Sequence, residues 1–230
     1  MLCVRLARID ALGMEADDAG APDWLGESER RRWGALADER RREFVAGRQL
    51  LRAVLAQATG LADGHWDIEA PDDAAPLVRG PVRVHASVSH RLGWVAAAVS
   101  DAVVGVDLEV ARNARGDLAG RAALMLAPDE LVAWHALSED RREPALLAAW
   151  TAKEAWFKAS EAGAVPRDFR RVGARPCDAA RANVRAWTAG PLHVALCSRD
   201  AAALARVACD GLPPGAAAAF LDVAAGTGFA

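Results

Sequence analysis

The stretch VVGVDLEV, residues 103–110, places two carboxylates inside a run of valines. Side chains alternate between the two faces of a strand, so Gly105, Asp107 and Glu109 share one face, and the opposite face carries Val104, Val106, Leu108 and Val110. A charge removed from water is costly unless a partner neutralises it. The pattern therefore leaves two interpretations open: a half-buried strand with a solvated acidic face, or two carboxylates that hold one hard cation.

A second stretch, WTAKEAWFKA at residues 150–159, combines acids and lysines with large aromatic side chains. On a helix, Glu154 and Lys158 are neighbours at positions i and i+4, which allows an ordinary ion pair on a solvated face. A capping box from Thr151 to Glu154 is a weaker alternative, because the apolar pattern starts earlier and places Thr151 inside the helix. Three aromatic residues in so short a segment indicate a helix that is buried on most sides.

The segments around these two stretches alternate between predicted strands and predicted helices. Strands are predicted at residues 2–9, 82–90, 94–100, 103–110, 193–198 and 204–209. Helices are predicted as a consecutive pair within residues 27–60, at 127–138, and from Pro144 to Gly163. The three successive strands in the middle of the chain predict an antiparallel meander, and the whole order predicts an α+β fold with two halves of similar design.

Composition restricts the functions that this chain of 230 residues can have. Its formal net charge of -3 argues against nucleic acid as the main partner, and no apolar run reaches the length of a membrane span. The N-terminus carries no signal-peptide core, so we expect a soluble cytoplasmic protein. None of the cysteines lies in a CxxC pair, which argues against a structural zinc site.

Taken together, the two stretches resemble the signature pair of the 4′-phosphopantetheinyl transferases. That family carries (V/I)G(V/I)DxE followed by (F/W)(S/C/T)xKE(A/S)xxK, and each residue type stands where the pattern requires it. The likeness extends to SVSHRLGWV before the first signature, to GRQLLR at residues 47–52 and to LAPDEL between the signatures. These segments are similar to the single-chain, surfactin-type subfamily.

The resemblance implies a reaction in which the phosphopantetheine arm of coenzyme A moves to a serine of an apo carrier protein, with release of adenosine 3′,5′-bisphosphate. It implies Mg²⁺, or alternatively Mn²⁺, as the metal, which suits a reaction at a pyrophosphate. The implied fold has two similar α/β halves with antiparallel sheets in a pseudo-two-fold arrangement. Residues 1–102 would carry the coenzyme-binding basic helix and the SH motif, and residues 103–230 the metal-binding and catalytic signatures. A monomer is expected.

The same resemblance implies roles for individual residues. The implied metal ligands are Asp107, Glu109 and Glu154. The implied catalytic residues are Asp107, Glu154 and Lys158, and Glu154 is either a metal ligand or the base that accepts the serine proton. The implied coenzyme contacts are Arg48, Arg52, Ser89, His90, Lys153 and Lys158. Of the two arginines on one helix face, Arg48 is favoured for the 3′-phosphate.

Several alternatives stay open. Lys153 either contacts the adenosine end of the coenzyme or is solvated, and Glu130 either favours the start of its helix or assists the metal or the base. A serine-hydrolase interpretation of Ser89 and His90 is rejected, because adjacent strand residues point to opposite faces. The alternative functions are a Mg²⁺-dependent phosphohydrolase and a non-catalytic module that binds coenzyme A.

The chain departs from the family pattern at four places. These are the Ala75-Pro76 pair, Ser87, Arg91 and the glycine-poor segment 159–165. We expect these departures to alter the contacts with the coenzyme and to leave the metal site unchanged.

Overall fold

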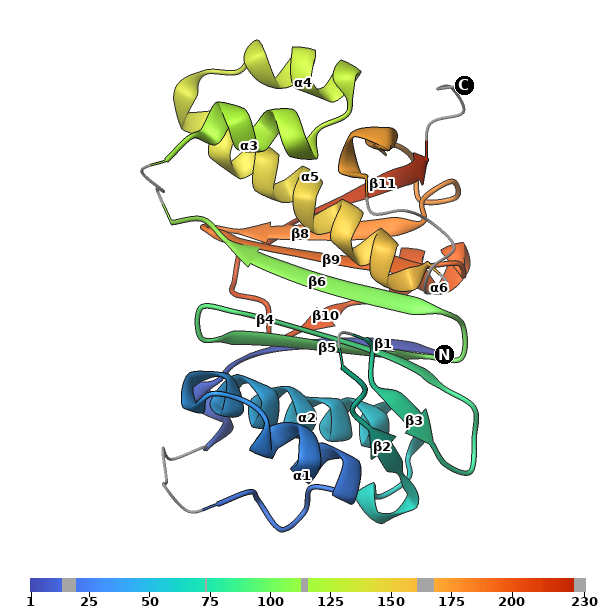
Figure 1. The fold of residues 1–230 in the computed structure, drawn as a ribbon. Coiled ribbons are helices and arrows are strands. Elements are labelled where there is room, and N and C mark those ends of the chain that lie inside the picture. Colours follow the sequence, from blue (N-terminus) through green and yellow to red (C-terminus); the bar gives the residue numbers. More distant parts are fainter. Residues whose placement is uncertain (14–19, 73, 113–115, 161–167, 226–230) are drawn as a thin grey trace.

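The computed structural model describes residues 1–13, 20–72, 74–112, 116–160 and 168–225. These residues form four layers, with two β-sheets stacked face to face and one long helix on the outer side of each sheet (Figure 1). The predicted α+β class with antiparallel sheets is confirmed. Each sheet has a long helix on its outer side, so the two sheet-and-helix pairs are similar in design.

The first sheet has the strand order β10-β1-β5-β4. Its strands are β1 (Leu2–Arg8), β4 (His85–Arg91), β5 (Trp94–Ser100) and β10 (Cys209–Asp210). Strands β1, β5 and β4 pair antiparallel, whereas the short β10 runs parallel to β1. A small separate sheet joins β2 (Asp67–Glu69) to β3 (Leu77–Arg79).

The second sheet is antiparallel throughout and has the order β6-β9-β8-β11-β7. Its strands are β6 (Val104–Val110), β7 (Val172–Pro176), β8 (Val184–Ala189), β9 (Leu192–Ser198) and β11 (Ala217–Ala225). Three of these strands, β7, β8 and β11, are not predicted from the sequence, because their residues alternate too weakly to stand out from loops.

Two long helices cover the outer faces of the sheets, with shorter helices beside them (Figure 1). The helices are α1 (Glu27–Gly34), α2 (Asp38–Thr59), α3 (Leu118–Met125), α4 (Pro128–His135), α5 (Glu139–Ala159) and α6 (Ala201–Arg206). Short 3-10 turns lie at Asp10–Leu12, Asp63–His65 and Phe169–Arg171. The predicted helix pair is confirmed as α1 and α2, and Gly60 ends α2 in the left-handed conformation that glycine adopts most easily.

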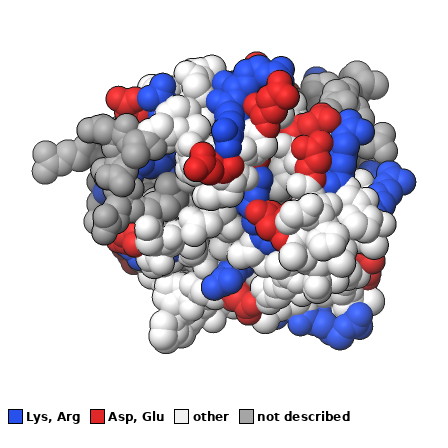
Figure 2. All heavy atoms as spheres, turned by 90° about the horizontal axis from the view of Figure 1, so that it is seen from below, with Lys and Arg blue, Asp and Glu red and all other residues white. Residues whose placement is uncertain are grey.

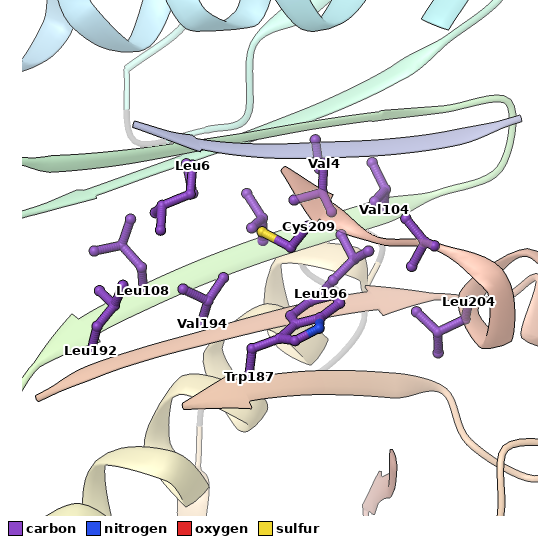
Figure 3. Packing of buried hydrophobic residues seen from close by; sticks show 14 of the residues in the cluster. Val4, Leu6, Val104, Leu108, Trp187, Leu192, Val194, Leu196, Leu204 and Cys209 are labelled. Atoms are coloured by element: carbon purple, nitrogen blue, oxygen red, sulfur yellow. The ribbon is translucent and has the colours of Figure 1, made fainter. Parts of the chain in front are cut away.

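The main core lies between the two sheets (Figure 3). Val4 and Leu6 of β1 pack there against Val106 and Leu108 of β6, together with residues of β9 and α6. A second cluster lies between α2 and the first sheet, and a third between α5 and the second sheet. Strand β6 therefore presents its apolar face to the central core, which leaves the face with Gly105 and Asp107 toward α5, as the alternation predicts.

The edges of the two sheets meet where β4 runs beside β6. Ser87 Oγ accepts a hydrogen bond from the backbone N–H of Val106 at 3.0 Å, and Ser89 Oγ accepts one from Leu108 at 3.4 Å. Serine hydroxyls thus satisfy backbone donors of an edge strand that would otherwise be unpaired and buried. This junction brings β4 and its SH motif next to the acids of β6.

Three predictions about elements are wrong. The strands β4, β5 and β6 do not form a meander, because β1 occupies the free edge of β5 and β6 pairs with β9. Residues 204–209 are not a strand, because Asp200 caps the alanine-rich helix α6 and only Cys209–Asp210 is extended. Helix α5 begins at Glu139 and contains Pro144 in its second turn, so this proline does not mark the start of the helix. The predicted end at Gly163 lies outside the described residues.

The charged side chains are mixed on the face that α1 and α2 cover. Figure 2 shows acidic and basic groups interspersed there, rather than one sign gathered into a stripe. Among the described residues, no helix has both the length and the apolar content that a membrane crossing requires.

Candidate active site

Strand β6 and helix α5 approach each other unusually closely at Gly105. A Cβ atom added at Gly105 would lie 2.1 Å from the carbonyl oxygen of Ala155 and 2.7 Å from the amide nitrogen of Ala159. Real side chains do not tolerate such distances, so only glycine permits this contact. The close approach brings Glu154 and Lys158 of α5 over the acidic face of β6.

Asp107 is the centre of this contact and is almost fully buried. Lys158 Nζ donates to Asp107 Oδ1 at 2.7 Å and to the carbonyl oxygen of Val106 at 3.1 Å. Ser89 Oγ donates to the same oxygen of Asp107 at 2.9 Å. The two signature segments therefore meet through a buried ion pair, in which Asp107 has the partner that a charge away from water requires.

Ser89 thus orients Asp107 and does not hydrogen-bond to His90. Its hydroxyl contacts Asp107 and the backbone of Leu108, and the residue is not among those that line the cavity described below. The coenzyme contact of Ser89 stays a prediction; of the two serines, Ser87 is the one that lines the cavity.

Glu109 lies further along β6 and has a different cation beside it. Arg91 Nε is 3.0 Å from Glu109 Oε2. Burial raises the pKa of Glu109, and the carboxylates of Asp107 and Glu154 raise it further, while Arg91 and Arg121 oppose them. The three acids of β6 and α5 therefore lie within electrostatic reach of one another. Arg91, where the chain departs from the family pattern, therefore contacts one of the predicted ligands.

The donor set suits a hard divalent cation, since Mg²⁺ prefers a few carboxylate oxygens together with substrate phosphates. Asp107 and Glu154 both raise the pKa of Glu109, and a cation would relieve that repulsion. Across the described parts of the chain, however, no three His, Cys, Asp or Glu side chains are already grouped as ligands. Lys158 pairs with Asp107 and Arg91 pairs with Glu109, so a metal would have to share these carboxylates with the two cations or displace them.

A cavity of about 610 Å³ adjoins this cluster. Its walls come from α1, α2, β4, the segment before β3, and the last turn of α5. The lining residues are Arg32, Glu43, Phe44, Gly47, Arg48, Pro71, Ala74, Ala75, Pro76, Ser87, Val88, His90, Phe157, Lys158 and Ser160. Lys158 is thus shared between the cavity and the acid cluster, which joins the two into one site.

The two arginines predicted for the coenzyme lie in different surroundings. Arg48 lines the cavity, and its Nη1 is buried without a hydrogen-bond partner among the described residues. Burial lowers its pKa to about 10, and the nearby carboxylate of Glu29 opposes that shift. Arg52 instead binds Glu29 Oε2 at 2.5 Å and Asp63 Oδ1 at 3.0 Å, and does not line the cavity as described. Of these two arginines, Arg48 is therefore the one that faces the cavity.

His90 faces the cavity from β4. Its Nδ1 lies 3.1 Å from Glu43 Oε2, without the geometry of a hydrogen bond. Burial lowers the pKa of His90 and outweighs the opposing charge of Glu43, so the imidazole is mainly neutral at pH 7. A phosphate nearby would favour its protonated form and gain a charged donor.

Lys153 is not a solvated side chain, which corrects one of the two predicted alternatives. It is completely buried and donates to Glu130 Oε2 at 2.5 Å, to the carbonyl oxygen of Met125 at 2.8 Å and to that of Phe169 at 3.2 Å. All of its donors have protein acceptors, which leaves none for a coenzyme. Lys153 therefore fastens α5 to the segments around it.

Glu130 is fully engaged in the same network. Its carboxylate accepts the N–H of Ala127 at 2.8 Å, which caps α4, and the N–H of Ala174 at 2.7 Å in addition to Lys153. The prediction that Glu130 favours the start of its helix is confirmed. Its three donors give it a structural role and argue against its use as a base.

The sequence did not indicate the contacts that Glu29, Glu43 and Arg91 make. Each contact joins segments that lie far apart in the chain, so no local spacing reveals it. The only signal was at Arg91, which departs from the family pattern.

Comparisons with known proteins agree with the motifs. A family model described as the 4′-phosphopantetheinyl transferase superfamily matches residues 103–210. The 4′-phosphopantetheinyl transferase HetI of Nostoc sp. (strain PCC 7120) is 26% identical over 155 residues, which is 65% of this chain and 65% of the relative. The 4′-phosphopantetheinyl transferase psf-1 of Bacillus pumilus is 29% identical over 132 residues, or 57% of this chain and 54% of the relative. Each match thus spans less than two thirds of the relative's length.

Proposed function

We propose that this chain, whose residues 103–210 match the model of the 4′-phosphopantetheinyl transferase superfamily, transfers the 4′-phosphopantetheine arm of coenzyme A to a serine of an apo acyl or peptidyl carrier protein. The serine oxygen forms a bond to the phosphorus on the pantetheine side of the pyrophosphate. The bond from that phosphorus to the nucleotide breaks, and adenosine 3′,5′-bisphosphate leaves. The relatives carry the name of this activity, and two halves in one chain fit the surfactin-type subfamily.

The observation that carries this proposal is the contact between Lys158 and Asp107. It joins the two signatures through a lysine that also lines the cavity, at an Nζ–Oδ1 distance of 2.7 Å. Pyrophosphate displacement needs charge neutralisation and alignment, which this lysine and the carboxylates near it supply.

The cavity is the proposed site for coenzyme A. Arg48 offers a buried N–H without a described partner, and an arginine donor of this kind suits a phosphate oxygen. His90 lies on the same wall, and Phe44 and Phe157 add apolar surface for the uncharged parts of the ligand. The volume of about 610 Å³ lies within the range of sites that hold small molecules.

Asp107, Glu109 and Glu154 are the proposed ligands of Mg²⁺, with Mn²⁺ as a possible substitute. When bound, the ion supplies positive charge that neutralises the pyrophosphate oxygens. Lys158 then releases Asp107 and donates to a phosphate oxygen in the cavity that it already lines. The alternative role of Glu154 is that of the base, which accepts the serine proton either directly or through a water.

We also propose that the protein acts as a monomer in the cytoplasm, with residues 1–102 and 103–230 as its two halves. The support is that residues of both ranges line the same cavity, so one chain builds the whole site.

The test is to incubate the protein with an apo carrier, coenzyme A and Mg²⁺ and to measure the carrier by mass spectrometry. We expect the carrier to gain one phosphopantetheine arm, and Asp107→Asn to lower the rate by at least about a hundredfold, in the range by which removal of a key charged group reduces catalysis. Asp129→Asn is the matched control, because Asp129 forms an exposed ion pair with Arg175.

The reaction products distinguish the proposed transferase from the two alternative functions. Coenzyme A cleavage without a mass gain on any of a panel of carriers would point to a phosphohydrolase. Binding of coenzyme A with neither cleavage nor transfer would point to a binding module. Either result, with folded protein, would overturn the proposed transfer.

A further inference from the structure

Arg91 and Glu109 form an ion pair between the two halves of the molecule. Arg91 is the last residue of β4 in the first sheet, and Glu109 lies on β6 in the second sheet. The Nε–Oε2 distance is 3.0 Å, with the arginine side chain 47% exposed and the glutamate side chain only 14% exposed. The cation therefore reaches the acid cluster from the solvent side.

The two cations at the acid cluster differ in the alternative partners that a bound ligand would offer them. Lys158 lines the cavity and has a new partner when a pyrophosphate is bound there. Arg91 is not among the described residues that line the cavity, so a ligand in the cavity offers it no replacement for Glu109. Its charge therefore remains beside the acids whether or not the coenzyme is bound.

We propose that Arg91 is an internal counter-ion that holds Glu109 while the carboxylates carry no metal, and that it thereby lowers the affinity of the site for divalent cations. This proposal rests on the proposed function, because it takes Asp107, Glu109 and Glu154 as the metal ligands. It makes Arg91 a positioning residue that sets the metal concentration at which the site fills.

The physical reason is competition and repulsion at one carboxylate. A divalent ion bound to Glu109 must open the ion pair or share the carboxylate with a guanidinium close by. Repulsion between these charges, reduced by water and salt, corresponds to an affinity change of about threefold to tenfold. The effect should shrink as salt is added, because the arginine is half exposed.

The experiment measures metal binding directly and needs no carrier protein. Mn²⁺ is titrated into the metal-free protein, free Mn²⁺ is followed by electron paramagnetic resonance, and Mg²⁺ is then used as a competitor. The variants are Arg91→Gln, which removes the charge but keeps a polar side chain, and Arg91→Lys, which keeps the charge. Arg79→Gln is the matched control, since Arg79 makes an ion pair of 2.9 Å with Glu69 in the small separate sheet.

We expect Arg91→Gln to bind Mn²⁺ about threefold to tenfold more tightly than the wild type at low salt, with Arg91→Lys and Arg79→Gln close to the wild type. Equal affinity in Arg91→Gln and Arg79→Gln would overturn the proposal, and so would weaker binding in Arg91→Gln. The variant Asp107→Asn tests the metal site separately from the role of Arg91. If the wild type binds Mn²⁺ no better than Asp107→Asn, the proposed metal site fails, and the role of Arg91 fails with it.

Discussion

At the scale of single residues, Leu92 lies in the hairpin beside Arg91. Among the described residues it is the one non-glycine residue with a positive φ. Arg91 pairs with Trp94, so Leu92 and Gly93 form a two-residue turn with φ values of 49° and 77°. Turns of this type favour Asn or Gly at both positions, because a side chain with a branched or bulky Cγ is strained at positive φ. Leu92 therefore carries strain next to the proposed site.

Replacing Leu92 by Asn should stabilise the protein. Asn tolerates the left-handed region, so we expect a gain of about 0.5–1 kcal/mol in the free energy of unfolding and a melting temperature higher by about 1–4 °C. Leu92→Ala is the control, because it removes the side chain but keeps the Cβ and most of the strain. Thermal unfolding of both variants checks this, and a melting temperature for Leu92→Asn no higher than that of Leu92→Ala contradicts it.

At the scale of elements, the site depends on how closely α5 lies on β6. Gly105→Ala would place a Cβ 2.1 Å from a backbone oxygen of α5, which a helix cannot avoid by rotating a side chain. We expect a loss of about 3 kcal/mol in the free energy of unfolding, or a displaced helix. In either case, the contact between Lys158 and Asp107 should weaken and the proposed transfer should slow.

Gly173→Ala in β7 is the matched control, because open space surrounds that position. Urea unfolding of the two variants gives the comparison. Equal stability of Gly105→Ala and Gly173→Ala would show that β6 and α5 are not held as closely as the structure has them.

The sequence predicted the elements whose cause is local. The alternation in β6 and the helical spacing around Glu154 are properties of neighbouring residues, and both are present in the structure. The contacts of Lys153 and Arg91 depend on segments that only folding brings together, so no local pattern in the sequence indicates them. The two motifs nevertheless indicated that β6 and α5 belong to one site, although neither motif shows this contact by its local spacing.

At the scale of the whole molecule, the two sheets share one hydrophobic core, and a strand from the C-terminal part of the chain joins the first sheet. The short β10 comes from the C-terminal part of the chain but pairs with β1 in the first sheet. Its residue Cys209 packs in the central core with Val4 and Leu196 (Figure 3). Because removing either sheet would expose this core, we infer that the two sheets stabilise each other.

The thiol of Cys209 offers a way to measure that shared core. Burial, with a smaller contribution from Asp210, raises its pKa from 9.0 to about 12. Between these values the unfolded chain loses the thiol proton while the folded protein keeps it, so stability falls as the pH rises above 9. Cys209→Ala should therefore lose about 1 kcal/mol less than the wild type when the pH is raised from 8 to 10. The chain contains no tyrosine, so no phenol titrates in this window. The comparison uses urea unfolding at both pH values in the presence of a reducing agent, with Cys177→Ala as a half-buried control. If the pH dependence in Cys209→Ala equals that of the wild type, the thiol is exposed, and β10 does not cover the core between the sheets.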